Sequence, residues 1–113
     1  MDMDVDVDSG ATFGQVLSAA RRRAGLSQRE LAARIRKEDG EPISPQYLND
    51  LERDRRNPPA SHFLKQLAAV LELPEEYLDF VAGQLPADLR QGRYAPDQVQ
   101  AAFSAFRRTL RGS

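Results

Sequence analysis

The sequence has no cysteine and one histidine, His62. The absence of cysteine excludes disulfide bonds, thiolate chemistry and cysteine-ligated zinc sites. No carboxylate lies at metal-ligand spacing from His62, which we interpret as an ordinary residue near a helix start. The sequence therefore predicts no metal site and no cofactor.

Long apolar runs are missing too. No apolar segment approaches the roughly 20 residues that a helix needs to cross a bilayer. The first eight residues are acidic, whereas a signal peptide begins basic and continues apolar. We therefore expect a cytoplasmic protein with no membrane partner.

The usual motifs of enzymes are also absent. We find no glycine-rich phosphate loop, no nucleophile beside a histidine and no cluster of metal ligands. Glu75 and Glu76 are adjacent carboxylates, but neighbours on a helix point in different directions, and acidic residues are common at helix N-termini. The sequence thus predicts no catalytic residues and no enzymatic activity.

The charge that is present is unevenly distributed. The net charge is −1, with 16 basic and 17 acidic residues, but residues 12–65 hold 11 basic and seven acidic side chains. Four of the other acidic residues are Asp2, Asp4, Asp6 and Asp8. We interpret residues 1–10 as a disordered acidic tail, because aspartate is depleted in strands and chain ends are seldom held in place. The remainder resembles a basic module.

Apolar residues recur at helical spacing from the end of this tail onwards. A first helix is expected over about residues 12–24, with Thr12 and Gln15 as a capping box. Ser27 and Glu30 form a second box, which opens the next helix. Both starts are thus marked by local chemistry.

A turn and a third helix are expected to follow. Charged residues, a glycine and a proline break the helical pattern between Arg36 and Pro42. The third helix begins near Ser44 and should bury Leu48 and Leu51, which leaves its other side polar. A helix of this kind, buried on one face only, is suited to lie in the major groove of DNA.

Four further segments are expected to be helical, and none resembles a strand. A fourth helix carries Leu64, Leu67, Ala68 and Leu71, and a short fifth helix opens at Pro74. One helical turn is anticipated at Ala87–Arg90, and a last helix starts at Pro96. The fold class is therefore all-α, with five helices followed by a trailing one.

Three motifs in order carry a family resemblance. They are Gly25-Leu26-Ser27-Gln28-x-Glu30-Leu31-Ala32, then Ser44-x-x-Tyr47-Leu48-x-x-Leu51-Glu52, then Arg56-x-Pro58. This set resembles the phage-repressor/Cro-type (Xre) helix-turn-helix family of transcriptional regulators. The resemblance implies a five-helix lambda-repressor-like DNA-binding domain over residues 11–83, followed by a C-terminal helical extension over residues 84–113.

The resemblance also implies residues that contact double-stranded DNA. Gln28, at the start of the second helix, and Tyr47 are expected at phosphates. Gln46 and Asn49 are the expected base readers, since an amide can bond bidentately to adenine. The other implied contacts are Ser44, Pro45 and Asp50 on the recognition helix, and Arg53, Arg55, Arg56 and Asn57 in the loop after it. Glu52 is expected to be structural, paired with an arginine of the second helix such as Arg29.

Two features leave the details of DNA contact open. The segment between Ile35 and Ile43 is longer than the turn usual in the family, so it could tilt the recognition helix or add a backbone contact through Lys37. The run Arg21–Arg23 is either a phosphate clamp or only a solvated face at the end of its helix.

The last helix has an apolar stripe formed by Val99, Phe103, Phe106 and Leu110. The stripe could fold back on the five-helix core, but we favour pairing with a second copy, since two modules spaced along DNA bind a palindrome more tightly than one. The leading hypothesis is thus a dimeric repressor that binds a short inverted repeat. The alternative is an interaction adaptor or antitoxin of the same fold, whose regulatory protein partner binds the last helix.

Overall fold

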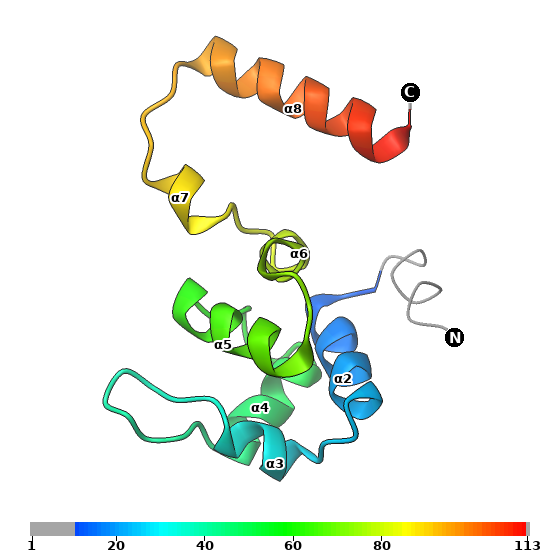
Figure 1. Cartoon of the computed structure of the whole chain (residues 1–113), viewed down its shortest axis with the longest axis vertical. Helices are drawn as coiled ribbons and strands as arrows, with labels where there is room; N and C mark the ends of the chain where they lie inside the picture. Colours follow the sequence, from blue (N-terminus) through cyan, green and yellow to red (C-terminus); the bar gives the residue numbers. More distant parts are fainter. Residues whose placement is uncertain (1–10, 113) are drawn as a thin grey trace.

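The computed structural model describes residues 11–112, so the predicted acidic tail lies outside the described residues, as does residue 113. Seven helices and no strand occur in the described part (Figure 1), which confirms the all-α prediction. They are α2 (Phe13–Arg23), α3 (Gln28–Ala33), α4 (Pro45–Glu52), α5 (Ser61–Leu71), α6 (Glu75–Val81), α7 (Ala87–Arg90) and α8 (Pro96–Arg111).

The helix starts follow the local chemistry of the sequence. The side chains of Thr12 and Ser27 each accept a hydrogen bond from the N3 backbone N–H, and the side chains of Gln15 and Glu30 each accept one from the backbone N–H of the cap residue. Both predicted capping boxes are therefore confirmed. Ser44 caps α4 by accepting from the backbone N–H of Tyr47 at 3.0 Å. These contacts satisfy amide donors that have no partner inside a helix.

One apolar core joins α2 to α6. Its buried side chains include the residues predicted at helical spacing in α4 and α5, and it takes up Ile35 and Ile43 from either side of the long turn. α2 and α3 both pack against α4, and α5 packs against α6. The position of α4 is therefore fixed from two sides by its leucines.

The end of α4 lies very close to the start of α2. Asp54 has a left-handed backbone (φ 58°), and its carboxylate accepts from Gly14 N–H at 2.9 Å and from the Thr12 hydroxyl at 2.6 Å. A Cβ on Gly14 would meet the carbonyl oxygen of Glu52 at 2.5 Å, so only glycine permits this approach.

The long turn before α4 forms a small hairpin. Arg36 and Pro42 make an isolated antiparallel bridge, and Lys37 N–H donates to the carbonyl of Glu41 at 2.7 Å. Gln66 of α5 holds the base of the hairpin: it accepts from Arg36 N–H at 2.7 Å and donates to Arg36 C=O at 2.9 Å. The extra residues are therefore ordered rather than a loose insertion.

The last helix lies beyond α6, on the far side from α3 and α4 (Figure 1). None of its described residues is buried. Its contact with the rest of the chain includes the Phe106 ring, whose centroid is 6.1 Å from that of Phe80 on α6. Phe103 and Phe106 also meet edge to face, at 6.4 Å.

Candidate nucleic-acid interface

α4 has one apolar side and one polar side. Leu48 and Leu51 are 0% and 1% exposed, whereas Gln46 is exposed and Asn49 and Asp50 are half-buried. The remaining predicted contacts at the start of the helix, Ser44 and Pro45, are exposed. The structure thus gathers the predicted base-contacting residues on one polar surface.

An ion pair beneath this surface joins α2 to α4. Arg21 Nε donates to Glu52 Oε2 at 2.6 Å and Nη2 donates to Oε1 at 3.0 Å, while Nη1 donates to the carbonyl of Leu26 at 2.8 Å. The hydrogen bond that Arg21 donates to Glu52 raises the pKa of Arg21. The expected pairing of Glu52 with Arg29 is therefore wrong, because the guanidinium that Glu52 meets is that of Arg21 on α2.

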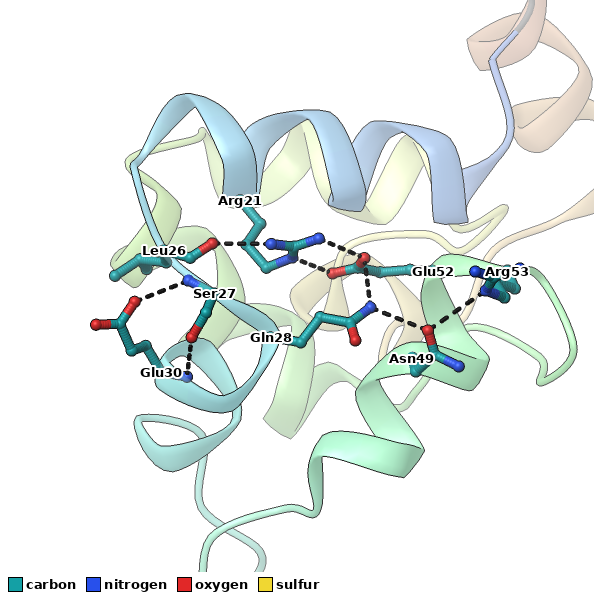
Figure 2. A network of polar contacts seen from close by, with 8 residues as sticks. All are labelled: Arg21, Leu26, Ser27, Gln28, Glu30, Asn49, Glu52 and Arg53. Atoms are coloured by element: carbon teal, nitrogen blue, oxygen red, sulfur yellow. Dashed lines mark hydrogen bonds and ion pairs between the residues drawn. The ribbon is translucent and has the colours of Figure 1, made fainter.

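The same carboxylate holds the amide of Gln28. Gln28 Nε2 donates to Glu52 Oε1 at 3.0 Å and to Asn49 Oδ1 at 3.1 Å, as Figure 2 shows. Arg53 Nε approaches the same Asn49 oxygen at 3.4 Å. The predicted phosphate-contacting residue of α3 and a predicted base reader of α4 are thus directly bonded.

A second, smaller cluster lies along α4. Gln46 Nε2 donates to Asp50 Oδ1 at 3.0 Å, and Arg55 Nη1 donates to the same oxygen at 3.2 Å. The side chain of Arg55 is 56% exposed, so the ion pair is weak and its guanidinium keeps other donors accessible. Three of the predicted DNA-contacting residues therefore form one hydrogen-bonded group.

Tyr47 lies between the polar surface and the core. Its ring is half-buried beside Phe63 of α5, with centroids 6.3 Å apart, and the Arg56 guanidinium carbon lies 5.3 Å from the Tyr47 ring centroid. Asn57, the last predicted contact, is exposed in the same loop. The cation–π contact orders Arg56 without covering its charge.

The three arginines at the end of α2 have different environments. Arg22 and Arg23 are exposed, whereas Arg21 is half-buried in the ion pair with Glu52. The sequence left open whether this run is a phosphate clamp or a solvated face. Arg21 fits neither interpretation, because its guanidinium is paired with Glu52 and is not exposed.

The sequence analysis missed a buried carboxyl on α6. Asp79 is 3% exposed, and its Oδ1 has no hydrogen-bond partner within the described part of the chain. Burial raises the pKa of Asp79, and the nearby Glu75 adds to the effect. An acidic residue between apolar positions of a short helix is the sequence signal that could have indicated it.

Residues 11–112 contain neither a cluster of three or more potential metal-ligating His or acidic side chains nor a helix long and apolar enough to span a membrane. The chemistry available at the α3–α4 surface is thus that of amide, carboxylate and guanidinium groups. Such groups bind by hydrogen bonding and charge.

Comparison with known families identifies this arrangement. The sequence model of the helix-turn-helix domain matches residues 12–80, from the cap of α2 almost to the end of α6. The chain belongs to the helix-turn-helix domain family. α3, α4 and the hairpin between them all lie within the matched residues.

Two known proteins are similar to this helix-turn-helix chain. The uncharacterized HTH-type transcriptional regulator RghRB of Bacillus subtilis (strain 168) is 31% identical over 94 residues, which cover 83% of this chain and 63% of the relative. The chain therefore spans less than two thirds of that relative's length. A chain from a SinR protein/SinI protein complex superposes with a TM-score of 0.50 and 22% identity, covering 90% of this chain and all of that one. At this identity the likeness shows the fold alone.

These findings confirm the predicted homology to helix-turn-helix transcriptional regulators. Such regulators bind DNA and are not enzymes, in agreement with the sequence-based prediction. The phage-repressor branch, the DNA-contacting residues and the dimer remain predictions.

Proposed function

We propose that this helix-turn-helix protein is a cytoplasmic, sequence-specific repressor of the phage-repressor type, which binds a short inverted repeat as a dimer. The observation that carries the proposal is the two-sided character of α4: Leu48 and Leu51 fix it to the core, and Gln46, Asn49 and Asp50 form its polar side. A helix held in this way fits the major groove, which is about 12 Å wide.

The residues around α4 supply contacts to the DNA backbone. Arg53, Arg55 and Arg56 follow the recognition helix and are all exposed. Gln28 lies at the first position of α3; its side-chain amide donates to Glu52 and Asn49, so the backbone amides of this helix start are the donors left for a phosphate. These positions support a positioning role in which phosphates set the register of α4 on the duplex.

The exposed stripe of α8 supports the dimer. Val99, Phe103, Phe106 and Leu110 are 39–60% exposed, and Phe80 extends the apolar surface onto α6 at 54% exposure. A second copy presents the same surface, so a two-fold pair would cover both stripes at once. α8 lies on the far side of α6 from α4 (Figure 1), so pairing through α8 would leave the polar side of α4 uncovered.

A substitution that introduces a charged side chain into the apolar stripe tests whether the protein dimerises through it. Phe103→Glu should convert a dimer into a monomer in sedimentation equilibrium, because it places a carboxylate in an apolar contact. Ala101→Glu is the matched control, since Ala101 is exposed about half a turn away on the same helix. A monomeric wild type, or equal effects of the two variants, would contradict the dimer.

Selection of bound sites from random duplexes tests the function. The expected result is one consensus with two-fold symmetry, whose affinity falls steeply as salt increases. Gln46→Ala should relax preference at one base pair of each half-site by about 1–3 kcal/mol. Binding without any preferred sequence would refute the proposal.

A second candidate uses the same stripe differently. If the stripe is covered by another protein, the chain is an adaptor or antitoxin rather than a homodimeric repressor. The SinR-like chain of similar fold was solved in a complex with a second protein, SinI. A monomer that does not bind random duplexes at low salt, but forms a stoichiometric complex through the stripe, would favour this function.

A further inference from the structure

Charged groups at both ends of the α3–α4 network determine how its amides are oriented. Arg21 can only donate, so Glu52 is held as an acceptor, and Glu52 in turn requires the Nε2 side of Gln28. The second N–H of Gln28 then requires the oxygen of Asn49, which also faces the donor-only Arg53. Figure 2 shows this series of contacts from Arg21 to Arg53.

The oxygen of Asn49 is therefore occupied. It accepts from Gln28 and Arg53, which together use both of its lone pairs. No contact within residues 11–112 occupies Nδ2 of Asn49. Asn49 thus presents hydrogen-bond donors alone, and the bidentate adenine contact expected from the sequence is closed to it.

The cluster around Asp50 presents an acceptor where Asn49 presents donors. Asp50 is an acceptor, so Gln46 must turn its Nε2 toward Asp50, and this leaves Gln46 Oε1 free. Gln46 and Arg55 both donate to Oδ1 of Asp50, and no contact of the described residues uses Oδ2. Asp50 thus presents an acceptor oxygen only, whereas Gln46 presents Oε1 together with the one N–H that Asp50 does not use.

We infer that the polar side of α4 is divided into a donor site at Asn49 and an acceptor site at Asp50, and that this division determines which base edges the protein accepts. Phosphates carry no donors, so the acceptor site fits only an exocyclic amino group, which is adenine N6 or cytosine N4 in the major groove. The donor site fits an acceptor, either a base atom (purine N7, guanine O6 or thymine O4) or a phosphate oxygen. The inference rests on the proposed function and names the base chemistry of that same surface.

Two reciprocal isosteric substitutions test the inference. Asn49→Asp keeps the oxygen that Gln28 and Arg53 use, but turns the free donor into an acceptor. Asp50→Asn keeps the oxygen that Gln46 and Arg55 use, but turns the free acceptor into a donor. The double variant has the net charge of the wild type, and thermal denaturation checks that all three variants fold.

The readout is the base preference of each protein in selection from random duplexes. At the base pair that contacts Asp50, the wild type should prefer adenine or cytosine, and Asp50→Asn should change that preference to guanine or thymine by about tenfold. Asn49→Asp should change preference at a different base pair, toward an amino-bearing base, if Asn49 contacts a base. If it contacts a phosphate, affinity should fall equally for all sequences.

The outcomes separate the two proposals. Should the wild type select a consensus that Asp50→Asn leaves unchanged, the polarity inference is wrong while the proposed function stands. Unchanged preference and affinity in Asn49→Asp would overturn the donor site in the same way. A wild type that selects no sequence refutes the proposed function, and the inference fails with it.

Discussion

Arg21 Nε lies 2.6 Å from Glu52 Oε2, and this contact joins the last turn of α2 to the last turn of α4. The two side chains are only 12% and 4% exposed. Since Glu52 also accepts from Gln28, the pair both anchors α4 and orients the amides beside it. The Arg21–Glu52 ion pair therefore determines how the polar side chains of α3 and α4 are oriented.

Glu52→Ala should lower the free energy of unfolding by about 3 kcal/mol, because it leaves Arg21 largely buried without a counter-charge. Urea denaturation measures the loss. Arg22→Ala, an exposed neighbour on α2, should change stability by less than about 0.5 kcal/mol. Equal stabilities of the two variants would show that the pair contributes nothing.

Gly14→Ala should destabilise the protein by roughly 1–3 kcal/mol, since the new Cβ would meet the carbonyl oxygens of Leu51 and Glu52 at 2.6 and 2.5 Å. Gly25→Ala, beyond the other end of α2, is an informative comparison. Nothing lies within 4 Å of a Cβ at Gly25, so the loss of stability in this variant comes only from the positive φ. A crystal structure of the Gly14 variant should show α2 displaced from the end of α4. An unmoved α2 with unchanged stability would contradict this description.

Ser27→Ala should cost about 1 kcal/mol of stability by removing the side-chain acceptor for Glu30 N–H. Glu30 still bonds the backbone N–H of residue 27, and this bond lowers the pKa of the Glu30 carboxyl. A lowered folded-state pKa contributes stability above the unfolded value, and this contribution is lost as the pH falls through the folded pKa. Denaturation at pH 7 and pH 3 measures both effects; the exposed Ser104→Ala, mid-helix in α8, should not destabilise.

Asp79→Asn should stabilise the protein at neutral pH by an amount of order 1 kcal/mol, because it removes a buried charge. The pKa of Asp79 is raised by burial, by Glu75 and, to a smaller extent, by Glu76 and Asp88, against the opposing effect of Arg90. Because the folded-state pKa of Asp79 is raised, the contribution of Asp79 to stability is fully present below the ordinary value of 3.8 and is lost as the pH rises through the folded pKa. Thermal denaturation between pH 3 and 7 should show the advantage of the variant growing with pH; a constant difference would disprove the assignment.

The features predicted from the sequence are local ones. The two capping boxes, Pro45 at the first position of α4, and the leucine spacing of α4 and α5 depend on residues within one or two turns. For this reason helix starts and buried faces could be placed from the sequence alone.

The features that were missed depend on tertiary packing. Glu52 meets Arg21 across 31 residues and Asp54 meets Gly14 across 40, and these pairs require the relative position of two helices. The polarity of Asn49 is likewise invisible in the sequence, because its neighbours come from α3 and from the loop after α4. Spacing predicts which residues share a face, but not which atoms they present.

The most direct test of the account is backbone amide NMR of the protein with and without its selected duplex. We predict that signals shift at the start of α3, along α4 and through Arg53–Asn57, while those of α5 change little. Shifts confined to α5, α6 or α8, with α4 unchanged, would contradict the claim that the polar side of α4 contacts DNA.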